Sequence, residues 1–209
     1  FTDVTAATTL PARVLRANYN SVHVFDLDLD GDLDLFLIPA GAAAPPVVLR
    51  NNGNGTFKDL YAFSTLRNVR LFSTADVDAD GDPDLAIVSA NGLMILINER
   101  LGQYRERPVR QDLGEITAIG AADINSDGTM DFVVLNRAGQ IMRVVDNGAD
   151  NEWEVAEIAL IAGSNADVAQ LVLTDLDNNG SLDILASGRH LLLRDADGRF
   201  TPVNLPADV

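Results

Sequence analysis

The sequence predicts an all-β fold, a β-propeller built of four-stranded blades, and three observations lead to this prediction. A nine-residue acidic pattern, D-x-[DN]-x-[DN]-G-x-x-D, occurs four times in the 209 residues. Its copies begin at Asp26, Asp76, Asp123 and Asp175, so the period is about 50 residues, which is typical of a four-stranded blade. The apolar runs between the copies are short, and no apolar periodicity of helical length occurs.

The first period shows how the strands are expected to follow one another. Short β-rich runs at 22–25, 35–38, 47–49 and 56–60 are separated by Gly, Pro and Asn, as in strands joined by tight turns. In the third period, residues 131–135 read Asp-Phe-Val-Val-Leu, which indicates a strand buried on both faces. We therefore expect about four strands in each period.

The repeats define the expected domain organisation. Residues 1–209 form a single propeller domain or part of one, with residues 1–4 as an extra outer strand. The approximate repeats are 5–61, 62–110, 111–158 and 159–209. Four repeats form either a four-bladed ring or a fragment of a larger propeller, and the sequence leaves both alternatives open.

Composition excludes several classes of function. The net charge of -16 and the isoelectric point of about 4.2 would repel a phosphate backbone, so we expect no binding of nucleic acid. There is no cysteine, which excludes disulfides, thiolate metal sites and cysteine nucleophiles. The longest uncharged run, 35–49, contains three prolines and is shorter than the roughly 20 residues of a membrane span.

The acidic repeats carry the net charge of the chain. They hold 16 of the 31 acidic residues, and the 15 that remain equal the number of basic residues. If the glycine at position 6 allows a sharp bend, the side chains at positions 1, 3, 5 and 9 converge. Two carboxylates ~5 Å apart repel by roughly 3 kcal/mol at an effective dielectric constant of about 20. A divalent cation would reverse this repulsion.

Calcium is the cation that suits these loops best. It accepts six to eight oxygen ligands in tolerant geometry, whereas magnesium requires a stricter octahedron and zinc prefers His or Cys. We expect up to four Ca²⁺ sites, in which position 7 contributes its backbone carbonyl and the loops with Asn125 and Asn179 bind more weakly. The predicted metal-site residues are Asp26, Asp28, Asp30, Asp32, Asp34, Asp76, Asp78, Asp80, Asp82, Asp84, Asp123, Asn125, Asp127, Thr129, Asp131, Asp175, Asp177, Asn179, Ser181 and Asp183.

An EF-hand is excluded as the origin of the pattern. That loop requires a glutamate at position 12 and a helix on each side. Position 12 is occupied here by Leu37, Ile87, Val134 and Ala186, none of which can bind a metal through its side chain. We expect the aspartate at position 9 to take the place of that glutamate, and strands to flank the loop.

With these loops the chain resembles the FG-GAP or VCBS repeats of integrin-α-like β-propellers. In those repeats a D-x-D-x-D-G-x-x-D calcium loop joins the first and second strands of a blade, and the resemblance covers essentially the whole chain. The Phe-Gly and Gly-Ala-Pro signatures are not intact, and the turn at 51–57 is closer to the bacterial VCBS-type branch. The resemblance implies an extracellular, cell-surface or periplasmic protein, in which further domains of a longer chain are possible.

Three functions remain open at this point. We favour a calcium-stabilised binding or scaffolding module for a protein or glycan ligand, with no enzymatic activity and no catalytic residues. The alternatives are a carbohydrate-active enzyme, in which paired acidic residues act as acid and base, and a lectin-like sugar-binding protein. Every acidic cluster is a copy of the others, whereas catalysis needs one asymmetric constellation.

The other notable residues are expected to have structural roles. The two histidines, His23 and His190, lie in apolar strands, and no serine has the context of a nucleophile elbow. Aromatic residues follow turns once in each period, which favours packing over a sugar platform; they are Phe57, Tyr104, Trp153 and Phe200. The connections 39–46, 62–68 and 159–167 are expected on the face opposite the acidic loops, as a candidate partner surface.

Overall fold

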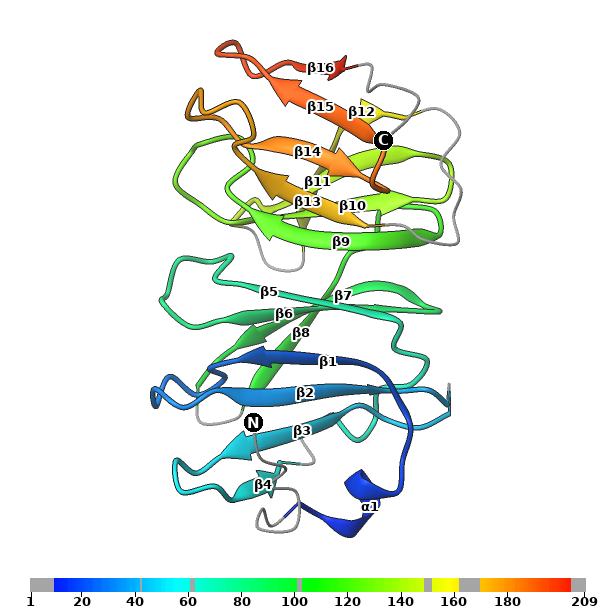
Figure 1. The fold of residues 1–209 in the computed structure, drawn as a ribbon, viewed down its shortest axis with the longest axis vertical. Helices are drawn as coiled ribbons and strands as arrows, with labels where there is room; N and C mark the ends of the chain where they lie inside the picture. The colour runs from blue at the N-terminus through cyan, green and yellow to red at the C-terminus, as the bar shows by residue number, and fades with distance from the viewer. Residues whose placement is uncertain are drawn as a thin grey trace.

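A computed structural model of the chain describes residues 10–41, 43–60, 63–100, 103–148, 152–161 and 170–203. These residues form four antiparallel sheets of four strands each (Figure 1). The first sheet contains β1 (Tyr19–Phe25), β2 (Asp34–Pro39), β3 (Val47–Asn51) and β4 (Phe57–Asp59). The second contains β5 (Leu71–Ala75), β6 (Asp84–Ser89), β7 (Gly92–Asn98) and β8 (Tyr104–Pro108).

The third and fourth sheets repeat the same up-and-down order. The third contains β9 (Ile116–Ala122), β10 (Asp131–Asn136), β11 (Gln140–Asp146) and β12 (Trp153–Leu160). The fourth contains β13 (Leu171–Thr174), β14 (Asp183–Ala186), β15 (His190–Arg194) and β16 (Phe200–Val203). In each sheet the strands pair in chain order. The expected all-β blades are therefore confirmed, whereas the extra strand expected at residues 1–4 lies outside the described residues.

The four sheets form an open row of blades. The first and fourth sheets lie at opposite ends of the row, with the second and third between them (Figure 1). The first strands of successive blades are neighbours, since β5 lies beside β9 and β9 beside β13. The described blades thus follow one another in a row, and the first and fourth lie apart at its two ends instead of closing a four-bladed ring (Figure 1).

The apolar core lies between the blades, because successive side chains of a strand point to opposite faces. In β10, Phe132 and Val134 pack against the second blade, while Val133 and Leu135 pack against the fourth. All four are fully buried. The apolar run 132–135 of β10 is therefore buried on both faces, which confirms the expectation for this strand.

The outer face of the first blade is covered by a short segment that the sequence did not reveal. The single helix of the described residues, α1 (Ala12–Leu15), places Val14 against Leu37, Val47 and Leu49. This helix is one turn long. No helix in the described ranges has the length and apolarity that a membrane span requires.

Candidate metal centres

The acidic loops join the first and second strands of every blade, as expected. The residue at position 4 of each loop adopts a left-handed conformation, with φ of 57° at Leu29, 60° at Ala79, 62° at Ser126 and 61° at Asn178. The glycine at position 6 has φ between 87° and 91° in all four loops, a region that strongly favours glycine. The repeated sequence therefore produces one repeated backbone shape.

The aspartate at position 1 fixes this shape from inside the loop. In the first loop the Asp26 carboxylate accepts hydrogen bonds from the backbone N–H groups of Asp30, at 3.2 Å, and Gly31, at 3.0 Å. The aspartates that begin the other three loops accept the same pair of bonds. These contacts hold the carboxylate at the centre of the turn while its remaining lone pairs are available to an ion.

The aspartate at position 9 is the first residue of the second strand and is completely buried. In the second blade the Asp84 carboxylate accepts hydrogen bonds from the N–H groups of Val77, at 3.0 Å, and Asn98, at 2.8 Å. Asp34 and Asp183 accept equivalent bonds from their own loop and third strand. Position 9 therefore links the loop to two strands of its blade.

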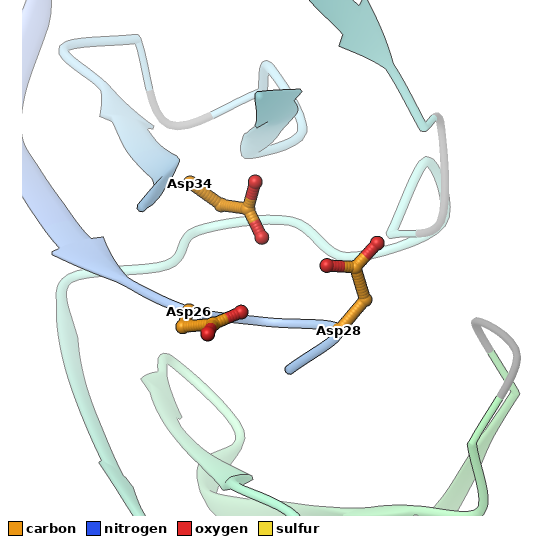
Figure 2. A group of neighbouring side chains, drawn as sticks. All are labelled: Asp26, Asp28 and Asp34. Atoms are coloured by element: carbon orange, nitrogen blue, oxygen red, sulfur yellow. The ribbon is translucent and has the colours of Figure 1, made fainter. Parts of the chain in front are cut away.

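In three loops the carboxylates at positions 1, 3 and 9 converge. Oxygens of Asp26, Asp28 and Asp34 lie within 4.8 Å of one another, and Figure 2 shows the three side chains facing a common centre. The same holds for Asp76, Asp78 and Asp84 in the second loop and for Asp175, Asp177 and Asp183 in the fourth. Each cluster offers only oxygen ligands, which suits a hard divalent cation such as calcium.

This convergence is electrostatically unfavourable unless a cation is present. Burial raises the pKa of Asp84 to about 7, even though two backbone N–H groups oppose the rise. Burial, together with the charges of neighbouring aspartates, also raises the pKa of Asp28, Asp34 and Asp78. Each group is thus held where its charged form is disfavoured, and a divalent cation would remove that cost.

Asp30 and Asp80 at position 5, which were expected to converge with positions 1, 3 and 9, are not among the converging carboxylates. At position 5, the Asp30 and Asp80 side chains accept the N–H of position 7 at 3.0 Å and 2.9 Å, and Asp127 and Asn179 do the same. At position 7, the carboxylate of Asp82 is bound by Arg100, and the Thr129 hydroxyl donates to Asp127. Asp32 and Ser181 occupy the corresponding places in the first and fourth loops. These side chains serve mainly the loop itself.

The third loop differs from the other three. Position 3 is Asn125, so Asp123 and Asp131 have no third carboxylate between them, whereas in the fourth loop the asparagine is at position 5. Hydrogen bonds from Thr129 and Asn125 lower the pKa of Asp127 to about 2. The sequence did not distinguish the third loop from the fourth, and the position of the asparagine was the signal that could have done so.

Arginines replace the missing contacts of the third loop. No hydrogen bond of normal geometry reaches the buried carboxylate of Asp131, and its nearest cation is Arg143 Nη1 on β11, at 4.0 Å. Val48, Ile95 and Leu191 occupy the position of Arg143 in the other blades. From the fourth blade, Arg194 donates to the carbonyl oxygen of Asn125 at 3.0 Å. Sequence analysis missed both arginines because neither lies in the repeated pattern.

The remaining candidates have the structural surroundings that were expected. The aromatic side chains that follow the turns all pack against core clusters; they are Phe57, Tyr104, Trp153 and Phe200. His23 packs against Phe72, and burial lowers its pKa. The β2–β3 connection leaves the end of the blade opposite the first acidic loop (Figure 1). Residues 162–167 of the third candidate connection, 159–167, lie outside the described residues.

Comparison with known proteins agrees with this architecture. The family described as FG-GAP-like repeat matches residues 26–87, 76–134 and 123–186. No curated protein matches the chain. Among solved structures, a lectin of Agrocybe aegerita, reported for its recognition of non-reducing terminal N-acetylglucosamine, superposes with a TM-score of 0.64 at 18% identity. The match covers 90% of this chain and 53% of the lectin chain.

These two comparisons have different weight. At 18% identity the likeness to the lectin establishes the propeller fold alone, and the chain spans about half of the lectin's length. The repeat matches run in phase with the acidic loops, since each match begins at position 1 of a loop and together they extend from residue 26 to residue 186. The chain therefore belongs to the family of FG-GAP-like repeats.

Proposed function

We propose that the chain is a calcium-stabilised binding module, in which calcium holds the loops of the first, second and fourth blades. The observation that carries this proposal is the threefold repetition of one cluster, in which a buried aspartate at position 9 faces the carboxylates at positions 1 and 3. Three copies of such repulsion have no structural benefit without a cation. Calcium would supply positive charge only, while the chain's own residues determine the shape of each loop.

The module would work outside the cytoplasm. Calcium sites in extracellular modules commonly have dissociation constants of about 10⁻⁴–10⁻³ M, and loops with three converging carboxylates are compatible with that range. We accordingly propose an extracellular, cell-surface or periplasmic location. The ligand would be a protein or a glycan, and the fold shared with a lectin supports a glycan as one candidate.

We propose no enzymatic activity for the module. The acidic side chains are divided among equivalent loops, whereas acid–base catalysis by two carboxylates needs two different environments. Neither described histidine contacts a carboxylate: His23 pairs with the Ser21 hydroxyl at 3.1 Å, and the Nε2 of His190 is buried without a partner. A binding role therefore accounts for the described residues better than hydrolysis does.

Changing Asp78 to asparagine tests the proposed calcium role, because its effect on stability should have opposite signs without and with calcium. Without calcium, D78N is expected to raise the free energy of unfolding by a few tenths of a kcal/mol, because it relieves burial of a charge and repulsion from Asp80 and Asp76. With calcium at millimolar concentration, D78N is expected to lower stability, because a charged ligand is lost. Thermal unfolding in both buffers measures the two effects.

The matched control for D78N is Asp197→Asn. Asp197 is an exposed acidic residue outside the loops, with its side chain 76% exposed. This substitution changes the net charge equally but should have the same small effect in both buffers. If D78N behaves like D197N, the second loop does not bind calcium.

The third loop provides a gain-of-function test. The double variant Asn125→Asp with Arg143→Leu restores the third carboxylate and removes the arginine beside Asp131. The fourth blade has a leucine, Leu191, at the position equivalent to Arg143. We expect isothermal titration calorimetry to count three calcium ions per wild-type chain and four per double variant. A wild-type chain with four equal sites, or a double variant with three, would contradict this assignment.

A further inference from the structure

A cavity of about 610 Å³ lies between the acidic-loop ends of the first and second blades. Its apolar wall is formed by Leu27, Leu29, Leu60 and Tyr104. Its charged lining comes from Arg50 and Lys58 on the first blade, Arg100 on the second, and two loop aspartates, Asp28 and Asp82. Its volume is within the range of small-molecule sites, roughly 300–1,000 Å³. In a chain of net charge -16, three cations around one cavity require an explanation.

Arg50 and Lys58 are directly opposite each other in the β3–β4 pair. Like charges in such cross-strand pairs are destabilising. The equivalent pairs of the other three sheets carry at most one charge; they are Ile97↔Arg105, Val145↔Glu154 and Leu193↔Thr201. The repeat fold therefore does not require a cation at both positions, and the repulsion between Arg50 and Lys58 lowers the stability of the sheet.

Neither cation has all of its hydrogen-bond donors paired within the described residues. Lys58, the sole lysine of the chain, is exposed and has no ion pair among the described residues. Arg50 has its Nη1 3.5 Å from Asp28 and its Nη2 3.2 Å from Asn52 Oδ1, while its Nε is buried without a hydrogen-bond partner. By contrast, Arg100 is bound to Asp82. An anion in the cavity would be attracted mainly by Arg50 and Lys58.

A leucine at position 29 does not benefit the stability of the protein. It is at position 4 of the first loop, with a positive φ of 57° and 53% of its surface exposed. The other loops have Ala79, Ser126 and Asn178 there, and asparagine tolerates this conformation best. A leucine that is both strained and exposed at the rim of a cavity would gain from contact with an apolar ligand body.

From these observations we infer that the cavity between the first two blades binds an organic anion, a carboxylate carried on an apolar body. The guanidinium group of Arg50 offers paired donors that match a carboxylate, and Lys58 adds a second positive charge. The leucines and Tyr104 contact the body of the ligand. This site adjoins the first calcium cluster and shares Asp28 with it.

The shared aspartate would couple the two sites, and this step rests on the proposed calcium role. A calcium ion in the first loop would draw the Asp28 carboxylate away from Arg50 and add positive charge beside the cavity. Arg50 and Lys58 would then both lack a carboxylate partner. Calcium should therefore increase the affinity for the anion, and by reciprocity the anion should increase the affinity for calcium.

Two pairs of probes test the anion site by isothermal titration calorimetry. N-acetyl-leucine is compared with the neutral N-acetyl-leucinamide, and glucuronate with glucose. In each pair a neutral group replaces the carboxylate while the rest of the molecule is kept, so a preference for the carboxylate reports the attraction of Arg50 and Lys58 for the anion. We expect at least one carboxylate to bind about tenfold more tightly than its neutral partner. The preferred pair distinguishes a peptide-like source from a sugar acid.

Three variants show where the probe binds. Lys58→Gln, at an exposed position where it relieves repulsion, should fold normally and lose most of the preference for the carboxylate. Arg105→Gln, at the equivalent position of the second blade, should retain it. Leu29→Asn should raise the melting temperature, because it relieves strain, yet weaken binding of N-acetyl-leucine.

The outcomes separate this inference from the proposed function. Equal binding of charged and neutral probes, or an unchanged preference in K58Q, would overturn the anion site. If the preference for the carboxylate probe is the same in calcium and in chelator, the anion site stands and its coupling to calcium is overturned. A preference that increases with calcium and disappears in K58Q would support both steps.

Discussion

Removal of calcium with a chelator is expected to lower the melting temperature of the protein by on the order of 20 °C. An ion that binds only the folded loop stabilises the protein by about 2.7 kcal/mol when its concentration is 100 times the dissociation constant. Three clusters with the same geometry would together contribute roughly 8 kcal/mol under that condition. This is comparable with the whole stability of an ordinary domain, about 5–15 kcal/mol.

The stabilisation has a definite structural origin. Without the ion, the carboxylates at positions 1, 3 and 9 repel one another, and burial disfavours the charge of Asp84, whose pKa rises to about 7. Differential scanning calorimetry in calcium and in chelator measures the effect. Magnesium is the control, because it requires a stricter octahedron and should restore only part of the stability. A melting temperature that is the same in all three buffers would contradict a metal role.

Replacing Arg107 by alanine is expected to lower the free energy of unfolding by roughly 3–5 kcal/mol. Arg107 is on β8 of the second blade, is 3% exposed, and binds the Asp146 carboxylate of the third blade with both terminal nitrogens. It also donates to the carbonyl oxygen of Glu152 at 3.2 Å and lies 4.4 Å above the centre of the Trp153 ring. The substitution removes this link and leaves a half-buried carboxylate without its main partner.

Chemical denaturation at two pH values measures the effect of R107A. Although burial raises the pKa of Asp146, the hydrogen bonds and charge of Arg107 outweigh it and hold the pKa below its usual value. A depressed pKa contributes stability above the unfolded pKa of about 3.9, and this contribution is lost as the pH falls. The loss caused by R107A should therefore be smaller at pH 3 than at pH 7.

The control for R107A is Arg105→Ala. Arg105 is on the same strand but is exposed, with Glu99 as its partner, so its removal should cost at most about 1 kcal/mol. Equal losses for the two variants would show that the link between the second and third blades does not depend on Arg107.

The repeat sequence was sufficient to predict the blades and the loop positions. Four copies of the acidic pattern determine where each second strand begins, and fully apolar segments such as residues 132–135 show that a strand is buried on both faces. The pattern also predicted that positions 1, 3, 5 and 9 converge, and the carboxylates at positions 1, 3 and 9 do so in three loops. These features repeat, and a repeated signal is visible in one sequence without any structure.

Features that occur only once were not predictable in this way. Arg107, Arg143 and the Arg50–Lys58 pair act across strands or between blades, and their partners lie 8 to 45 residues away. The left-handed conformation at position 4 was equally hidden, because leucine and alanine give no sign of it at Leu29 and Ala79. Contacts between blades depend on how the sheets are packed, which the repeat itself does not encode.

The most direct test of the account is an anomalous difference map from crystals grown with millimolar calcium. The account predicts a peak between the carboxylates of positions 1, 3 and 9 in the first, second and fourth blades, and a weak peak or none beside Asp131. If well-ordered loops contain only water in all three clusters, the claim that calcium holds these loops is contradicted.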